Sequence, residues 1–256
     1  MAPGDVELVH TAVVDGIATI TLDSVANRNA LSRRLVGQLL DAIDNATLDG
    51  EIHAIVITGN GPVFCSGADL TDPPSNASGN RFSYPDVLQA MIACPKPVVA
   101  KVNGAARAGG LGLIAASDIA IAPTSATFAF TEVRLGLVPA IIAVACRRVM
   151  DARAFARLAL VGETFDAATA VDSGLLTRAV HPDAFDDEIA ALLAEIHRTE
   201  PNAVATTKRL LDELATMSIE DGFAHAAAIS TNAFDSAEGR EGIAAFREKR
   251  PPSWAW

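Results

Sequence analysis

The N-terminal part of the chain alternates between strand-like and helix-like patterns. Apolar and polar residues alternate over 11–22, and Asp15-Gly16 in their middle is a typical hairpin turn. Ser32 then precedes a stretch with apolar residues at helical spacing and is a candidate N-cap. The nearly continuous apolar run 53–58 indicates a buried strand. The helical apolar positions are Leu35, Leu39, Leu40 and Ile43.

Strand and helix patterns continue downstream. Residues 97–102 and 117–122 predict buried strands, and Gly109-Gly110 between them opens an apolar helix. Residues 71–86 are polar and rich in breakers, which predicts a mobile loop, with a helix over 87–93 after it. From Pro139 onward the pattern is mostly helical, with one short strand. The predicted helices are 139–149, 151–160, 166–172, 183–199, 202–216, 219–235 and 237–248, and the strand is 175–180.

This order predicts an α/β core followed by a helical C-terminal part, and we place the division at 1–200 and 201–256. The chain has 256 residues, half of them hydrophobic, which suits one or two globular domains. Asp and Glu total 31 against 20 Lys and Arg, giving a net charge of -11 that disfavours nucleic-acid binding.

Cysteines, histidines and apolar runs narrow the class of protein. The three cysteines do not describe a disulfide scaffold or a metal pattern, and the five histidines are scattered, so no metal site is predicted. The first ten residues lack the pattern of a signal peptide, and the apolar run 138–146 is too short to cross a bilayer. We therefore expect a cytoplasmic protein that binds neither nucleic acid nor membrane.

Two glycine-containing turns could carry chemistry. The segments 63–70 and 106–113 each follow a strand and lead toward a helix start, where backbone N–H groups are exposed. Glycine there lets a ligand approach the backbone, and a helix N-terminus favours negative charge. If the two turns converge, their N–H groups form an oxyanion hole. The alternative for either turn alone is a glycine needed only for tight packing.

Glu132 is an acid in an otherwise apolar run, between Phe130 and Val133. Burial would disfavour its charged form and raise its pKa, which suits proton transfer near neutral pH. The alternative is an ion pair with Arg134 or Arg107. Two other chemistries fit poorly, because the glycines do not give GxGxxG in register and Ser66 lacks the GxSxG motif of a nucleophilic serine.

These segments, in this order, resemble the crotonase superfamily, also called the enoyl-CoA hydratase/isomerase family. The resemblance covers nearly the whole chain, and its anchors are specific when taken together. They are 29–32 (NALS), 64–70 (FCSGADL), 96–104 (KPVVAKVNG), Gly109-Gly110, 117–119 (SDI), 131–139 (TEVRLGLVP), Gly174-Leu175 and 246–250 (FREKR).

The resemblance implies a spiral of ββα units, with a C-terminal helical region that forms a homotrimer or, from two trimers, a homohexamer. The ligand it implies is an acyl-CoA thioester, which is the substrate, so no separate cofactor is expected. The thioester oxygen would lie between the backbone N–H groups of Ala68 and Gly109, with Glu132 as the acid/base. The implied CoA-binding positions are Arg28, Cys65, Ser66, Ala68, Asp69, Leu70 and Lys249, and Lys249 would serve either its own or a neighbouring subunit.

The chain departs from the family pattern at two places. Typical hydratases of the family use two glutamates around one water, and Gly112 stands here where the first would be. The segment 140–146 is apolar and branched where hydratases continue with glycines, which should narrow or reshape the acyl pocket.

Three functions remain open at this stage. The first is hydration of a 2-enoyl-CoA with Glu132 alone, which is favoured because the motifs resemble a bacterial methylglutaconyl-CoA hydratase-like branch that tends to keep only the second glutamate. The second is isomerisation of a 3-enoyl-CoA to a 2-enoyl-CoA by the same single base. The third is a non-catalytic acyl-CoA binder, against which the intact Glu132 and both donor turns count.

Overall fold

The strands form two sheets in a computed structural model that describes residues 6–72 and 83–255. The larger sheet has the order β1-β2-β3-β5-β7-β10. Its first two strands form an antiparallel hairpin around Asp15 and Gly16, which both have positive φ, and the other neighbours are parallel. The six strands are β1 (Val9–Val14), β2 (Ile17–Leu22), β3 (Ala54–Gly59), β5 (Val98–Lys101), β7 (Ile119–Pro123) and β10 (Arg178–Val180).

A second sheet has the order β4-β6-β8-β9 and is made of very short strands. The sequence patterns did not predict it, because two or three residues are too few to display the period of two that identifies a strand. Its first three strands are parallel, and β9 is antiparallel to β8. The strands are β4 (Val63–Cys65), β6 (Ala105–Arg107), β8 (Thr127–Ala129) and β9 (Phe165–Asp166).

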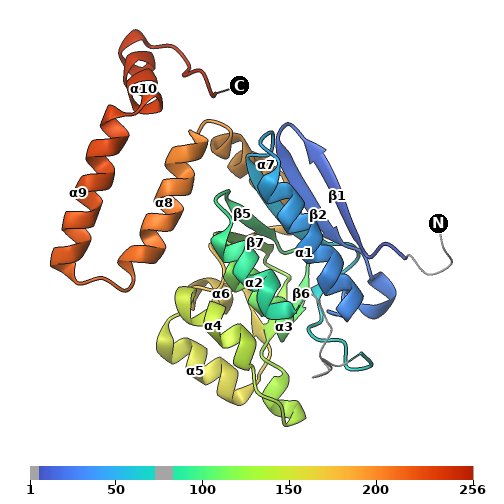
Figure 1. The fold of residues 1–256 in the computed structure, drawn as a ribbon. Coiled ribbons are helices and arrows are strands. Elements are labelled where there is room, and N and C mark those ends of the chain that lie inside the picture. The colour runs from blue at the N-terminus through green and yellow to red at the C-terminus, as the bar shows by residue number, and fades with distance from the viewer. Residues whose placement is uncertain (1–5, 73–82, 256) are drawn as a thin grey trace.

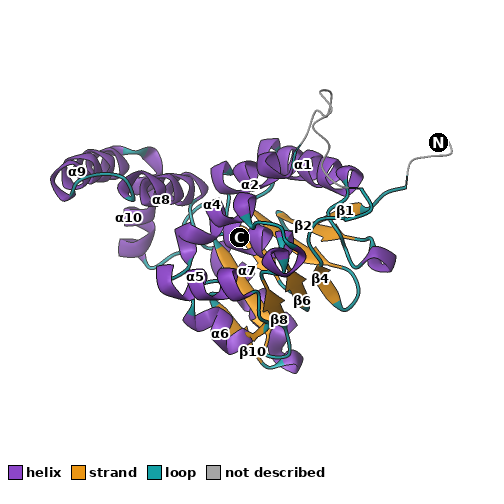
Figure 2. Ribbon diagram, turned by 90° about the horizontal axis from the view of Figure 1, so that it is seen from below, coloured by secondary structure: helices purple, strands orange, loops and turns teal. Residues whose placement is uncertain are grey.

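From β3 to β8, successive strands alternate between the two sheets, and this alternation is the repeated ββα unit. β3, β5 and β7 each belong to the larger sheet, and the strand after each of them belongs to the smaller one. A helix then returns the chain, as Figure 2 shows for the strands and the helices packed around them. The mixed α/β spiral predicted from the resemblance is confirmed by this topology and by the similar solved structures reported below.

The helices follow the predicted ones closely. Ser32 caps the first helix by accepting a hydrogen bond from the N–H of Leu35. The helices are α1 (Arg33–Leu48), α2 (Tyr84–Ala93), α3 (Gly109–Ala116), α4 (Ala140–Val149), α5 (Ala152–Val161), α6 (Ala167–Asp172), α7 (Phe185–Ile196), α8 (Pro201–Leu214), α9 (Ile219–Asp235) and α10 (Ala237–Glu248). Short 3-10 turns lie at Val25–Asn27, Glu132–Leu135 and Pro182–Ala184.

Helix α2 begins at Tyr84, three residues before the start predicted from the sequence. Ser83 and Asp86 form a capping box, and Pro85 lies in the first turn. These residues were interpreted as loop breakers, although Ser, Pro and Asp in this order are also signals of a helix start. The loop predicted over 71–86 is therefore wrong for residues 84–86, which belong to α2, and the part of the prediction that falls on 73–82 lies outside the described residues.

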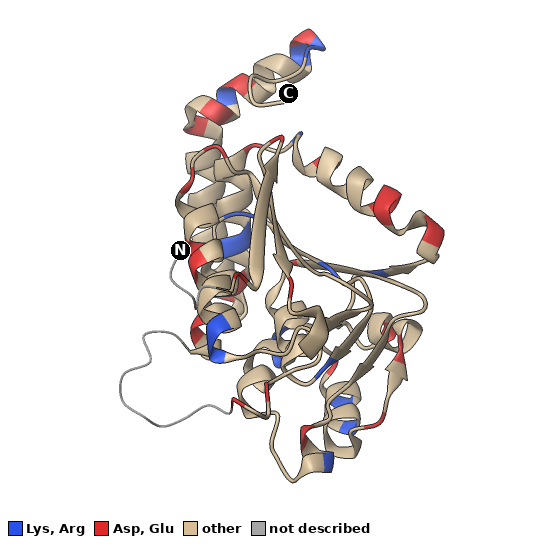
Figure 3. Ribbon diagram, turned by 90° about the vertical axis from the view of Figure 1, so that its right-hand side faces the viewer, with Lys and Arg blue, Asp and Glu red and all other residues tan. Residues whose placement is uncertain are grey.

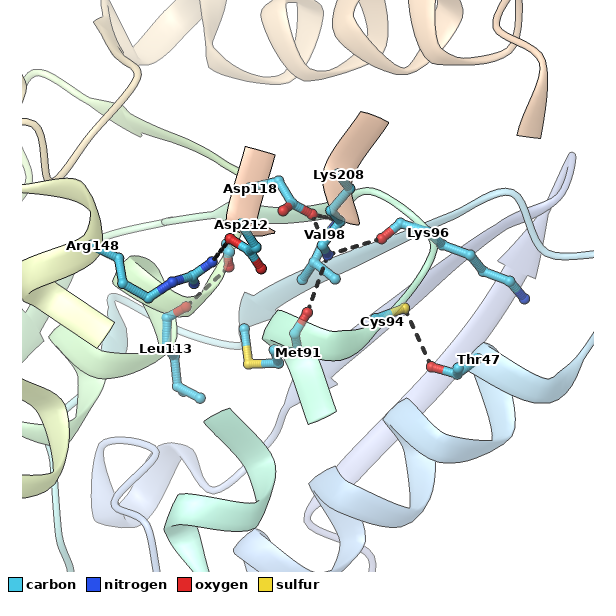
Figure 4. A network of polar contacts seen from close by, with 11 residues as sticks. Thr47, Met91, Cys94, Lys96, Val98, Leu113, Asp118, Arg148, Lys208 and Asp212 are labelled. Atoms are coloured by element: carbon cyan, nitrogen blue, oxygen red, sulfur yellow. Dashed lines mark hydrogen bonds and ion pairs between the residues drawn. The ribbon is translucent and has the colours of Figure 1, made fainter. Parts of the chain in front are cut away.

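The C-terminal helices α8, α9 and α10 extend away from the sheets (Figure 1). Their attachment to the core includes a polar network (Figure 4). Lys208 of α8 pairs with Asp118 at 2.7 Å and donates to the carbonyl of Met91 at 3.2 Å. Arg148 of α4 pairs with Asp212 of α8. The division of the chain at residue 200 stays a prediction.

Candidate active site

The first donor turn continues directly from β4. Leu31 lies beside this turn and forms a parallel β-bridge with Ala68. The Leu31 N–H donates to the Gly67 carbonyl at 2.8 Å, and the Asp69 N–H donates to the Leu31 carbonyl at 3.4 Å. Because backbone groups of an extended segment alternate in direction, the N–H of Ala68 points away from Leu31. Gly67 has a φ of +89°, which only glycine adopts readily.

The second donor turn joins β6 to α3. Ala108 has a φ of 47°, and Gly109 is the first residue of α3, so its N–H has no partner within the helix. The two turns touch each other: a Cβ added to Gly67 would lie 3.2 Å from the Gly109 nitrogen, and one added to Gly109 would lie 3.5 Å from the Gly67 Cα. The two turns therefore converge, and the use of their N–H groups as an oxyanion hole stays a prediction.

Glu132 lies at the start of a 3-10 turn after β8 and is half-buried. Its Oε2 is buried and has no hydrogen-bond partner among the described residues. Burial raises the pKa of this carboxyl, and its own backbone N–H opposes the rise in part. The ion pairs considered as an alternative are not formed: Arg107 donates to the carbonyl and hydroxyl of Thr127, and Arg134 donates to the Val161 carbonyl.

The position of the missing first glutamate is enclosed. A Cβ added to Gly112 would lie 2.6 Å from the Ile142 Cγ2 and 2.6 Å from the Tyr84 hydroxyl oxygen. Contacts below 3.0 Å require something to move, so residue 112 has no room for a side chain while these two groups stay in place. Ile142 belongs to the branched segment that was expected to reshape the acyl pocket.

Tyr84 and two thiols share this apolar region with Glu132. Burial raises the pKa of Tyr84 well above its ordinary value, and the charge of Glu132 adds to the rise. Burial, with a smaller contribution from Glu132, raises the pKa of Cys146 to about 12, and burial raises that of Cys65 to about 12. All three groups therefore keep their protons near neutral pH. Tyr84 was missed from the sequence because it lies within the segment 71–86, which was interpreted as a loop.

The structure brings the predicted CoA-binding residues of the N-terminal half together. The Ser66 N–H donates to the Arg28 carbonyl at 3.1 Å, and the Asn27 amide donates to Asp69 at 2.8 Å. Arg28 itself is exposed and lies in a left-handed turn with Asn29. Thr71 donates to Asp69 through its hydroxyl and its N–H, and these bonds lower the pKa of that carboxyl.

The remaining predicted positions differ in exposure and in place. Cys65 is buried beneath Gly110, where an added Cβ would lie 2.6 Å from the Cys65 carbonyl oxygen. Leu70 is exposed at 63%. Lys249 is exposed in a left-handed cap at the end of α10, which Figures 1 and 2 place away from β4 and β6. Within one chain, Lys249 therefore lies apart from the other predicted CoA-binding residues.

Comparison with known proteins defines the class to which this fold and site belong. The family described as "Enoyl-CoA hydratase/isomerase" matches residues 13–255. The chain belongs to this enzyme family, and hence to the crotonase superfamily.

Among its relatives is a Rhodobacter capsulatus protein named "Probable enoyl-CoA hydratase", which is 37% identical over 250 residues, or 95% of this chain and 96% of that protein. AtuE of Pseudomonas aeruginosa superposes with a TM-score of 0.90 at 34% identity, covering 98% of this chain and 100% of the other. An enoyl-CoA hydratase of Mycobacterium smegmatis gives 0.90 at 32%, covering 97% and 99%.

Within 6–72 and 83–255, no group of three or more His, Cys, Asp or Glu side chains could hold a metal ion. None of the helices in these same ranges is long and apolar enough to span a membrane.

Proposed function

We propose that this protein is an enoyl-CoA hydratase in which Glu132 alone carries the proton between water and substrate. The observation that supports this most directly is the buried Glu132 Oε2, which has no protein partner in the described chain. Leaving a buried polar atom unpaired costs about 1–3 kcal/mol, so such an atom needs a reason to exist. A substrate or water that binds it supplies that reason.

The reaction follows from three groups. The thioester oxygen of a 2-enoyl-CoA accepts hydrogen bonds from the N–H groups of Ala68 and Gly109. The Glu132 carboxylate takes a proton from water while the water oxygen bonds to the β-carbon, and charge moves onto the thioester oxygen as an enolate. The Glu132 carboxyl then returns its proton to the α-carbon, which completes the addition of one water. The N–H donors act mainly on the enolate-like transition state, because the negative charge develops there.

The alternative activity is isomerisation of a 3-enoyl-CoA to a 2-enoyl-CoA. Here Glu132 removes a proton from the α-carbon and returns it to the γ-carbon, and no water is consumed. The observation in its favour is the closed space over Gly112, because no second carboxyl can help to hold a water there. One base with a raised pKa is sufficient for this reaction.

The CoA part of the substrate is proposed to bind along 65–70, with Arg28 at the entrance. Acidic positions are spread over many helices and loops, with fewer basic ones between them (Figure 3). A phosphate group therefore needs local cations to approach a chain of net charge -11. Arg28 supplies one, and Lys249 of a neighbouring subunit is proposed to supply another.

The C-terminal helices are proposed to assemble a homotrimer or a homohexamer. Several of their large apolar side chains are exposed in the single chain, which is typical of surfaces that bind another protein. Light scattering on the purified protein would give the number of subunits. The exposed residues are Leu211, Met217, Ile219, Phe223, Phe234 and Phe246.

Incubation with crotonyl-CoA or a 3-enoyl-CoA in oxygen-18 water, followed by mass spectrometry, tests the proposed reaction. A labelled 3-hydroxyacyl-CoA would support hydration. A 2-enoyl-CoA formed from the 3-enoyl-CoA without label would instead support isomerisation. Binding of both CoA esters with neither product would contradict both proposed activities for these acyl groups.

A further inference from the structure

Tyr84 contacts the first turn of the helix that provides one of the two oxyanion donors. Its hydroxyl donates to the Gly109 carbonyl, and its ring lies close by, with Cε1 3.7 Å from the position of a Gly109 Cβ. In an α-helix the Gly109 carbonyl also pairs with the Leu113 N–H, so the phenol joins the first hydrogen bond of α3. The Leu31 Cδ1 lies 2.7 Å from the same Cβ position. Gly109 is thus packed against two side chains.

The Tyr84 hydroxyl also limits the space on the face of α3 that contains Gly112. It lies 2.6 Å from the Cβ position of Gly112, opposite the Ile142 methyl at the same distance. One oxygen atom therefore connects the donor residue Gly109 with the position where the family's first glutamate would be. Both effects depend on the capping box at Ser83 and Asp86, because it starts α2 where Tyr84 can reach α3.

The phenol serves as a hydrogen-bond donor and not as a base. Burial raises the pKa of Tyr84 well above its ordinary value, and Cys65, Cys146 and Glu132 add to this rise, while a hydrogen bond from Leu113 opposes it. The protonated hydroxyl can therefore stay on the Gly109 carbonyl throughout a reaction at neutral pH.

We propose that Tyr84 is a positioning residue of the oxyanion hole, whose hydroxyl fixes the first turn of α3 and thereby the direction of the Gly109 N–H. The proposal rests on the oxyanion hole invoked in the proposed function, but not on which reaction follows. An N–H donor stabilises developing charge only if it already points at the place where the charge forms. Gly109 has no side chain of its own to restrict its backbone, so the groups that contact it contribute to fixing its direction.

The test compares Tyr84→Phe with Gln89→Ala, a change on the exposed face of the same helix. Tyr84→Phe keeps the ring against Gly109 and removes only the hydroxyl. Acetoacetyl-CoA, which forms an enolate readily, reports on the oxyanion hole through its enolate absorbance, and butyryl-CoA reports on binding of a neutral thioester. We expect Tyr84→Phe to weaken enolate binding and to lower kcat by about tenfold, since small errors in orientation are costly. Butyryl-CoA affinity, KM and melting temperature should match those of Gln89→Ala.

The outcomes separate this proposal from the proposed function. An enolate band of equal strength in wild type and Tyr84→Phe would overturn the positioning role, whatever the turnover. An equal loss of butyryl-CoA and acetoacetyl-CoA affinity would also overturn it, because that indicates a general packing defect. A wild-type enolate band that Tyr84→Phe weakens supports the role of Tyr84 even if wild type adds no water to crotonyl-CoA. A wild type without an enolate band would overturn the proposal.

Discussion

The turns at Gly67 and Gly109 and the carboxyl of Glu132 are built in opposite ways. The turns are crowded: a Cβ on Gly67 would lie 2.7 Å from the Ala108 Cβ of the facing turn, and Leu31 is hydrogen-bonded on both sides of Ala68. Glu132 is half-buried and one of its oxygens lacks any partner among the described residues. Groups that must only hold a direction can be fixed by packing, whereas a group that exchanges protons with a ligand must be left accessible to it.

The largest expected effect comes from replacing Glu132, the group that carries the proton. Glu132→Gln should lower kcat for hydration or isomerisation by about 10³-fold, because it removes the acid/base group and changes little volume. The affinity for CoA esters should stay nearly the same, since the donor turns are unchanged. Steady-state kinetics together with calorimetric titration of butyryl-CoA would measure both. Full activity in this variant would exclude Glu132 as the proton carrier.

A smaller effect is expected when one of the two backbone N–H donors, that of Gly109, is removed. Gly109→Pro eliminates the N–H and should lower kcat/KM by about 10²-fold. Proline is tolerated at the first position of a helix, which is where Gly109 lies, although the positive φ of Ala108 adds strain. Gly109→Ala is the matched control, since it keeps the N–H and meets only the mobile end of Leu31 at 2.7 Å. Equal losses in the two variants would indicate crowding and not a lost donor.

The contrast also explains what the sequence could predict. The hairpin at Asp15, the cap at Ser32 and the amphipathic helices depend on neighbouring residues, and these predictions were confirmed. The two donor turns were predicted as turns from their glycines. Their contact depends on the pairing of β4 with β6, which places Val63 beside Ala105, and these strands are too short to show a pattern. Only the family resemblance joined them beforehand.

Tyr84 and Ile142 illustrate what local patterns leave out. Both side chains approach Gly112, although they lie on different helices, α2 and α4. Nothing in the hydrophobic pattern of either helix indicates this contact. The substitution of the family's first glutamate by glycine was visible from the sequence. The groups that fill the space around Gly112 were not visible, because their positions depend on how α2, α3 and α4 pack.

A loss of stability should follow when the Asn29 side chain, which holds the Arg28–Asn29 turn, is removed. Asn29 is fully buried; it accepts from the Ser24 N–H and donates to the carbonyls of Asn60 and Val63. Asn29→Ala should lower the free energy of unfolding by about 2–4 kcal/mol, because buried polar groups lose their partners and Ala disfavours positive φ. Denaturant unfolding would measure this change.

The control for that prediction is Asn202→Ala, since Asn202 is exposed on α8. It should change the free energy of unfolding by less than about 0.5 kcal/mol. Similar effects of the two substitutions would mean that the Asn29 network does not hold the Arg28–Asn29 turn.

The smallest expected effect is a pH-dependent difference in stability between wild type and Glu132→Gln. Burial raises the pKa of Glu132 in the folded state above its unfolded value, so the folded protein binds this proton more tightly. The contribution of this group to stability is therefore fully present below the unfolded pKa and is lost as the pH rises through the folded pKa. Glutamine has no such loss, although its buried amide carries a constant cost of its own. The melting temperature of the variant minus that of wild type should thus rise from about pH 5 to about pH 8. A flat difference would mean that Glu132 is solvated in the folded protein, and the contrast between the closely packed donor turns and the unpaired carboxyl would then fail.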